Sequence, residues 1–231
     1  MALSNVDIRK AIDAKEIIFD PPLDSDRQVQ PASVDLRLGA KIFKTSPDPA
    51  ARIIGEGEYL AVEPQEFVQA ITYERMELSS GLVGRFGIKS ALTRKGLYLF
   101  SGIQVDPGWR GYLVVSLFNT STQPIAIRFK EPFCSIEFDR VQTPADPPYR
   151  GIYLNQTDFS SEDVSWLMRA RGMTFGQVVQ AVQDLQSSVK SLDSTVKELR
   201  ASLAGLRTDM RIWLTFVAIV VTLASILSRV L

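Results

Sequence analysis

Short runs of apolar and β-branched residues fill the first two thirds of the chain, and Gly, Pro, Asn and Asp interrupt them. Runs of this length with so little helix between them predict a mainly β domain, either a sandwich or a compact barrel. A short helix is expected before the first of them, near residues 5–14. The predicted strands read SVDLRLG, EYLAVEP, EFVQAIT, GLVGRFG, GLYLFSG, GYLVVSLFN, PIAIRF and CSIEFDRV.

The pattern changes near residue 177 to apolar residues separated alternately by four and three positions. This heptad spacing predicts a left-handed coiled coil over residues 177–210. Valine at one seam position and leucine at the other favour two parallel strands. The alternative is a single amphipathic helix packed on the β domain. The seam consists of Val178, Val182, Leu185, Val189, Leu192, Val196, Leu199, Leu203, Leu206 and Met210.

A linker with a short helix is expected between these two parts. Ser160 and Asp163 form a capping box before the segment SEDVSWLMRA, which predicts that helix. Gly172 and Gly176 predict a hinge before the seam. The predicted organisation is a β domain at 1–158, a linker at 159–176, a coiled coil at 177–210 and a membrane helix at 211–231.

The membrane helix is predicted from an uncharged stretch, IWLTFVAIVVTLASILS, at residues 212–228. As a helix it would span about 25 Å, the short end for a bilayer core of about 30 Å. Trp213 at its leading edge is typical of an interfacial aromatic residue. A single-pass C-terminal anchor in the lipid bilayer is therefore expected, with a buried core helix as the alternative.

The charges around this stretch predict its orientation. Arg200, Arg207 and Arg211 precede it, whereas only Arg229 follows it. The positive-inside rule then places the N-terminal domain in the cytoplasm. The first residues, MALSNVDIRKAI, lack the long apolar region of a secretory signal.

Composition excludes several chemistries. The 231 residues include no histidine, so histidine-held zinc and histidine-based catalytic triads are impossible. Cys134 is the single cysteine, so neither a disulfide nor a thiolate metal cluster can form within one chain. The 26 basic and 26 acidic side chains balance, which argues against nucleic acid as a partner.

Three segments carry a family resemblance: PASVDLRLG at 31–39, LVGRFGIKSALTRKGL at 82–97 and VDPGWRGYLVVSLFN at 105–119. In this order and spacing, with the lead-in EPQEFVQAITYERMEL, they resemble the dCTP deaminase family, a branch of the trimeric dUTPase superfamily. The resemblance covers residues 3–157. It implies a dUTPase-like β-barrel or sandwich of the β-clip type, which binds a pyrimidine deoxynucleoside triphosphate with Mg²⁺ and uses no zinc.

The resemblance also implies a homotrimer with sites between subunits. Asp106 of one chain would then face Ser90 and Arg94 of another. The Val/Leu seam instead favours a dimer. We expect the trimer, because a large β interface should outweigh a soft packing preference, and keep the dimer as the alternative.

The segment KSALTRKGL has the chemistry of an anion site. Lys89, Ser90 and Arg94 lie at a predicted junction of strand and helix, where they offer cations, a hydroxyl and backbone N–H groups to a phosphate. Lys89 replaces the family's arginine, and Ala91 and Thr93 stand at its second serine and its alanine. One phosphate donor is lost and a bidentate cation becomes a point charge. The alternative is a short helix that these residues merely decorate.

Asp106 precedes a turn marked by Pro107 and Gly108. The resemblance places it at the sugar, where a carboxylate can hold or activate water, so the predicted catalytic set is Asp106, Ser90 and Arg94. A turn cap is the alternative reading of Asp106.

The segment PYRGIYLNQTD resembles the family segment that closes over the triphosphate. Tyr153 and Gln156 match its pattern, and they complete the predicted nucleotide-binding set with Lys89, Ser90, Arg94 and Asp106. Ile152 stands where a lysine is expected, so a cation for the γ-phosphate is missing.

Ser116 is the departure that bears on catalysis. The resemblance puts the deaminating glutamate five positions after Gly111, and this chain has Ser116 there. A serine hydroxyl is not a base near neutral pH without a partner. This argues against deamination but leaves dUTP hydrolysis open, because the dUTPase branch has an apolar residue at that position.

Three functions therefore stay open. The first is an enzyme of pyrimidine deoxynucleotide metabolism, either a dCTP deaminase or a dUTPase-type hydrolase. The second is a catalytically degenerate nucleotide sensor that reports through the coil to the membrane. The third is an oligomerising head.

Overall fold

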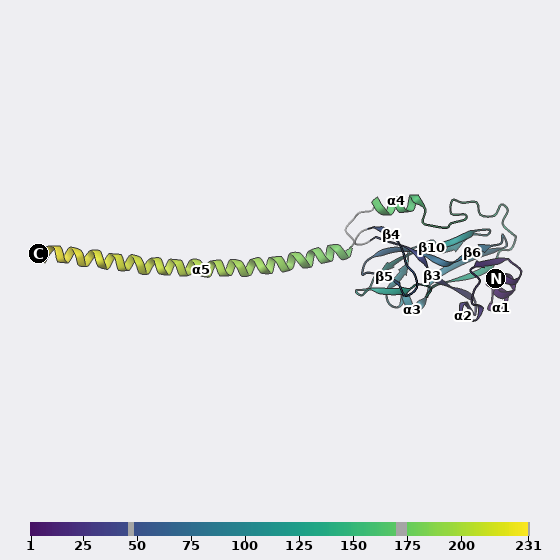
Figure 1. Cartoon of the computed structure of the whole chain (residues 1–231), viewed down its shortest axis with the longest axis horizontal. Coiled ribbons are helices and arrows are strands. Elements are labelled where there is room, and N and C mark those ends of the chain that lie inside the picture. The colour runs from purple at the N-terminus through teal and green to yellow at the C-terminus, as the bar shows by residue number, and fades with distance from the viewer. Residues whose placement is uncertain (46–48, 170–174, 231) are drawn as a thin grey trace. The chain divides into compact units, whose positions relative to one another are not determined.

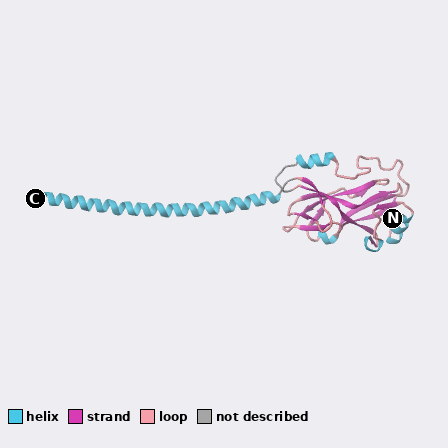
Figure 2. Ribbon diagram, in the orientation of Figure 1, coloured by secondary structure: helices cyan, strands magenta, loops and turns pink. Residues whose placement is uncertain are grey.

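The structure is a computed structural model that describes residues 1–45, 49–169 and 175–230. The chain divides into two units, Met1–Gly176 and Gln177–Leu231. Strands outweigh helices in the first unit, as Figure 2 shows, which confirms the predicted mainly β head.

Every run predicted as a strand forms one. They are β3 (Ser33–Lys44), β5 (Tyr59–Val62), β6 (Phe67–Leu78), β7 (Leu82–Ile88), β8 (Leu97–Leu99), β10 (Arg110–Asn119), β11 (Ile125–Arg128) and β12 (Pro132–Arg140). The strands that the pattern missed are short: β1 (Ile17–Asp20), β2 (Val29–Gln30), β4 (Ala50–Ile53) and β9 (Gln104–Val105). The head also holds the helices α1 (Asn5–Asp13), α2 (Ser25–Gln28) and α3 (Ser90–Thr93), and α1 is the short helix expected there.

One ten-stranded sheet and a two-stranded sheet build the head (Figure 1). The main path runs β8-β10-β6-β3-β12-β7-β9, with β1 on β6 and with β2 and β4 on β3. The pairs β10·β6, β3·β6 and β12·β3 each contain a register shift. Such shifts increase the local twist and bend the strands, so a sheet this large curls rather than lying flat.

Large side chains fill the interior of this curled sheet. Phe43, Phe133 and Phe138 are fully buried, and so is Cys134, which follows Phe133 in the sequence. Burial raises the pKa of the Cys134 thiol well above its usual range, so the thiol stays protonated. Cys134 is therefore a core residue rather than a reactive one.

Helix α4 (Ser161–Arg169) lies near the C-terminal end of the first unit. The backbone N–H of Asp163 donates to the Ser160 hydroxyl over 3.0 Å, which confirms the Ser160 half of the predicted capping box. Just before it, the ring of Phe159 packs edge-on against Phe43, with ring centroids 6.2 Å apart. This contact ties the segment to the sheet. Of the predicted hinge glycines, Gly172 lies outside the described residues, and Gly176 lies within helix α5 (Phe175–Val230).

Helix α5 carries the heptad seam. Where their side chains are described, the seam residues are exposed, from 39% at Val196 to 65% at Leu192. A coiled coil needs a second chain, so it stays a prediction.

Among the residues that the structure describes, no helix is long and apolar enough to cross a membrane. The predicted span at 212–228 thus receives no support from the structure. The side chains of residues 220–230 lie outside the described set.

Candidate functional site

A cavity of about 460 Å³ lies in the first unit, between β6, the β8–β10 segment and the stretch that leads into α4. Among the residues that the structure describes, its lining mixes aromatic rings with polar side chains and contains two carboxylates but no lysine or arginine. The lining residues are Gln69, Phe86, Phe100, Ser101, Gly102, Gln104, Val105, Asp106, Trp109, Leu113, Val114, Ser116, Tyr149, Tyr153, Gln156 and Asp163.

Asp106 lies where strand β9 ends, and its carboxylate accepts a hydrogen bond from Gln104 Nε2 over 2.6 Å. Its backbone carbonyl accepts from the N–H of Trp109 over 3.0 Å, and Gly108 has a φ of +82°. The residue therefore belongs to the turn while its side chain remains at the cavity. The backbone of Asp106 forms part of the turn, and its predicted role at a sugar stays a prediction.

Tyr153 and Gln156 reach the cavity because their segment is fastened to the start of β10. Trp109 Nε1 donates to the Tyr153 carbonyl over 3.1 Å, and the Tyr112 N–H donates to the Gln156 carbonyl over 2.9 Å. Gly111 makes this approach possible. Its φ is +145°, and a Cβ there would lie 2.7 Å from the Gln156 nitrogen.

The other carboxylate of the lining, Asp163, comes from helix α4. Its negative charge, followed by burial and the charge of Glu162, raises the pKa of Tyr153 above the ordinary 10.0. Tyr153 is therefore a neutral phenol at physiological pH. With Asp106 and Asp163 present, the cavity of a single chain favours an uncharged group over an anion.

Ser116 lies in β10 at the cavity, only 8% exposed. Gln69 Nε2 donates to the Ser116 hydroxyl oxygen over 3.2 Å, and the Ser116 N–H donates to the Ser101 hydroxyl oxygen over 2.7 Å. We call these three residues the serine–amide cluster. Its members are neutral, and no histidine exists in the chain to remove a proton from Ser116.

The segment around α3 has the predicted local structure. Lys89 is its N-cap residue, directly after β7, and Arg94 is its C-cap. None of Lys89, Ser90 and Arg94 lines the cavity described above. The structure thus brings together three of the predicted site residues, Asp106, Tyr153 and Gln156, and leaves the cationic segment elsewhere on the same chain.

Lys89 also has a partner that the sequence did not predict. Its ammonium group makes an ion pair with the carboxylate of Asp35, a residue 94% buried on β3. A lysine held in this way contributes less to phosphate binding than a free one, because part of its charge is already compensated.

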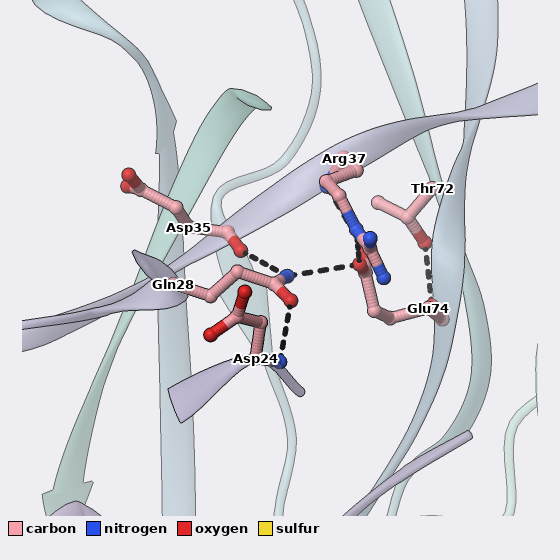
Figure 3. Close-up of polar contacts among 6 residues, drawn as sticks. All are labelled: Asp24, Gln28, Asp35, Arg37, Thr72 and Glu74. Atoms are coloured by element: carbon pink, nitrogen blue, oxygen red, sulfur yellow. Dashed lines mark hydrogen bonds and ion pairs between the residues drawn. The ribbon is translucent and has the colours of Figure 1, made fainter. Parts of the chain in front are cut away.

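Asp35 belongs to a buried polar network drawn in Figure 3. The side chain of Glu74 is fully buried and accepts from Arg37 Nε over 2.5 Å and from Gln28 Nε2 over 2.9 Å. Gln28 Nε2 also donates to the Asp35 carbonyl over 2.9 Å, and Thr72 donates to the Glu74 carbonyl over 2.9 Å. We call Gln28, Asp35, Arg37, Thr72 and Glu74 the Glu74 network. It links α2, β3 and β6, and Asp35 takes part through its backbone carbonyl while its carboxylate pairs with Lys89.

Sequence reasoning missed Gln69, Ser101, Gln104 and Asp163 as cavity residues. Asp163 was recognised only as a helix cap, and Gln69 lies in a strand, EFVQAIT, where it interrupts an otherwise apolar run. A polar residue in such a strand is the one signal that could have drawn attention to it. The partner of that residue depends on strand register, which the sequence does not give.

Comparisons with known proteins agree with this architecture. The family described as dCTP deaminase-like matches residues 2–141. The dCTP deaminase of Pyrococcus furiosus is 37% identical over 143 residues, which are 62% of this chain and 88% of that protein. The dUMP-forming dCTP deaminase of Persephonella marina is 31% identical over 169 residues, which are 68% of this chain and 93% of that protein.

A solved structure has the same fold. The 2′-deoxycytidine 5′-triphosphate deaminase of Agrobacterium tumefaciens superimposes with a TM-score of 0.52 at 20% identity. The match covers 61% of this chain and 47% of that one. The head is thus a curled β domain with the fold of that deaminase and with a polar cavity. The chain belongs to the dCTP deaminase-like family.

Proposed function

We propose that this protein binds a pyrimidine deoxynucleoside triphosphate at the cavity, with the base and sugar beside Ser116 and Asp106. The observation that carries the proposal is the cavity itself. In a chain of this family, it brings Asp106 together with the segment that holds Tyr153 and Gln156. A concave site with aromatic walls and a few convergent polar groups is typical of small-molecule binding.

The serine–amide cluster supports binding without deamination. By resemblance, Ser116 stands at the position of the glutamate that activates water. Its hydroxyl contacts only a neutral amide within the described residues, and an amide N–H that donates to the oxygen cannot remove its proton. No base is then available at this position to activate water for attack on a cytosine ring.

Hydrolysis of dUTP to dUMP and pyrophosphate is a second candidate, favoured by Asp106. Its carboxylate lines the cavity, is held by Gln104, and could accept a proton from a water that attacks phosphorus. In this role Ser90 and Arg94 would assist as phosphate ligands.

Mg²⁺ would enter with the phosphates of the nucleotide. In the described part of the chain, no group of three or more acidic, cysteine or histidine side chains is arranged to hold a metal. Magnesium in phosphate chemistry commonly takes one or two carboxylates and completes its coordination with phosphate oxygens and water. Asp106 and Asp163 are the carboxylates at the cavity that fit this need, and the chemistry supplied would be charge neutralisation on the phosphates.

We further propose a homotrimer in which a neighbouring copy brings Lys89, Ser90 and Arg94 to the phosphates. One chain separates its cationic segment from its cavity, so a second copy would complete the site. Phe100 at the cavity and Ile103 beside it are 64% and 52% exposed, which suits a protein interface. A parallel coiled coil of α5 would continue such an assembly, and a dimer is the alternative.

Attachment of residues 212–228 to a membrane, with the head in the cytoplasm, remains a prediction from the sequence. Fractionation of cells that express the full chain tests it. Recovery of the protein in the membrane pellet after a carbonate wash would support it, and recovery in the supernatant would contradict it.

The decisive experiment incubates the purified full-length chain with dCTP and with dUTP. Thermal shift, uracil formation and pyrophosphate release are monitored together. A thermal shift without product supports a binding protein that acts as a sensor, and pyrophosphate from dUTP supports the hydrolase. Uracil formed from dCTP would contradict our reading of Ser116, and no response to either nucleotide would leave an oligomerising head.

A further inference from the structure

The cross-strand pair Gln69 and Ser116 lies at the cavity wall. Strands β6 and β10 are antiparallel, and these residues are direct partners in their register. Both side chains line the cavity. A ligand group in the cavity can therefore contact the Ser116 hydroxyl. The bond from Gln69 to this hydroxyl affects how it can bond to the ligand.

The direction of the bond between them follows from burial. Gln69 Nε2 donates to Ser116 Oγ, and Gln69 Oε1 is buried with no hydrogen-bond partner in the described structure. The opposite orientation of the amide would leave an NH₂ group with unpaired donors in that buried place. The orientation present leaves that oxygen and one N–H without a partner, and an unpaired carbonyl oxygen costs less than an unpaired N–H, so Gln69 acts as the donor.

This arrangement leaves hydroxyl hydrogens unused at the cavity. Ser116 accepts from Gln69, so its own hydrogen is still available to donate. Ser101 accepts from the Ser116 N–H, and its hydrogen is available in the same way. No acceptor for either hydrogen is found among the described residues.

We propose that Gln69 is a specificity-determining residue, which sets Ser116 as a donor and makes the cavity prefer a base with a keto oxygen over one with an amino group. The inference rests on the proposed function. Uracil and cytosine differ at this group, since O4 is an acceptor and the N4 amine is a donor. A keto oxygen pairs with the hydroxyl hydrogens, whereas an amine faces them and leaves them unpaired. The cavity is therefore built for a uracil nucleotide.

The test is the ratio of two dissociation constants, measured by calorimetry on the full-length chain with the α,β-imido analogues of dUTP and dCTP. We expect the uracil analogue to bind about tenfold more tightly, the effect of one well-placed hydrogen bond. Gln69→Leu should bring the ratio to within about twofold, because Ser116 then turns freely. Gln123→Leu, on an exposed loop, is the matched control and should keep the ratio of the unaltered protein.

Gln69→Glu gives the sharper result. An ionised carboxylate only accepts, so Ser116 would donate to it and turn its lone pairs to the ligand. The preference should then move toward the cytosine analogue. A merely structural role of Gln69 would weaken both analogues equally and leave the ratio unchanged.

The outcomes separate the two proposals. Equal binding of both analogues by the unaltered protein, or a ratio that survives both substitutions, overturns the role of Gln69 while the nucleotide site stands. Binding of neither analogue overturns the proposed function, and the inference falls with it. If Gln69→Glu does not fold, Gln69→Leu alone decides, because leucine suits the apolar neighbours of that strand.

Discussion

The Glu74 network and the serine–amide cluster are both polar groups inside the same sheet, but they differ in how completely their hydrogen bonds are made. In the Glu74 network the fully buried carboxylate receives bonds from Arg37 and Gln28. In the serine–amide cluster, an amide oxygen lacks a partner in the described structure and two hydroxyl hydrogens are available. A complete network resists change because each loss leaves a buried group unpaired. An incomplete one can take up a ligand.

The largest effect is expected from Glu74→Ala, which removes the central carboxylate of the Glu74 network. Removing the carboxylate leaves Arg37 as a partly buried charge without its partner, so the free energy of unfolding of the head should fall by about 3–5 kcal/mol. Urea denaturation followed by near-ultraviolet circular dichroism measures it. Glu137→Ala, on the exposed side of β12, is the control and should stay within about 0.5 kcal/mol. A loss below about 1 kcal/mol at Glu74 would mean that the network is not structural.

A smaller effect on stability, with a larger one on binding, is expected from Gly111→Ala. The added Cβ would lie 2.7 Å from Gln156, at a φ that L side chains rarely adopt, so the strain should be about 1–3 kcal/mol. Relief of this strain would move Tyr153 and Gln156 away from the cavity and weaken nucleotide binding. Thermal unfolding and calorimetry measure the two effects. Gly87→Ala is the control, because a Cβ there meets nothing within 4 Å; equal nucleotide affinity in both variants would contradict the role of this segment.

Asp163→Asn removes one negative charge from the cavity that contains the serine–amide cluster. The charge of Asp163 raises the pKa of Tyr153, so the variant should lower that pKa toward the ordinary 10.0. The stability that Tyr153 contributes is fully present below pH 10.0, the ordinary pKa of the phenol, and is lost as the pH rises through the raised pKa of the folded state. Ultraviolet titration, with Tyr153→Phe for subtraction, measures the shift. In the absence of Mg²⁺, the same substitution should tighten triphosphate binding more than nucleoside binding, because one negative charge at the cavity is removed, and Asp184→Asn on α5 should alter neither. An unchanged titration would show that Asp163 does not act on Tyr153.

The smallest effect is expected outside both clusters, at the surface pair Glu16 and Arg140. Arg140 donates to both carboxylate oxygens, and this bond lowers the pKa of Glu16 below its ordinary 4.5. The contribution is therefore present above that pH and is lost as the pH falls through the lowered value. Glu16→Gln should cost less than about 1 kcal/mol at pH 6 and still less at pH 2, measured as a difference in unfolding free energy. A cost that is the same at both pH values would exclude the ion pair as its source.

The fold was predictable because it depends on local patterns. Alternation and turn residues mark each long strand, and the predicted runs became β3, β6, β10 and β12. Four short strands were missed, and two of them, β2 and β9, have only two residues each and carry no period. Their pairing comes from the long strands beside them.

The site was predictable only in part. The turn before Pro107 and the segment around Tyr153 could be read from the sequence, and the structure brings both to one cavity. The partner of Lys89 could not be read, because Asp35 lies 54 positions away on another strand. Cross-strand partners depend on register, and a shift of one residue would turn every side chain to the opposite face.

The sequence by itself determined where the long strands lie, that residue 116 is a serine, and that no histidine can assist it. These are matters of local pattern and composition. Only the tertiary structure decided that Gln69, 47 positions from Ser116, would be the group bound to its hydroxyl. It likewise decided that Lys89 would be paired with a buried carboxylate. The physical reason is that hydrogen-bond partners inside a curled sheet are set by strand order and register, which arise from the packing of the whole core.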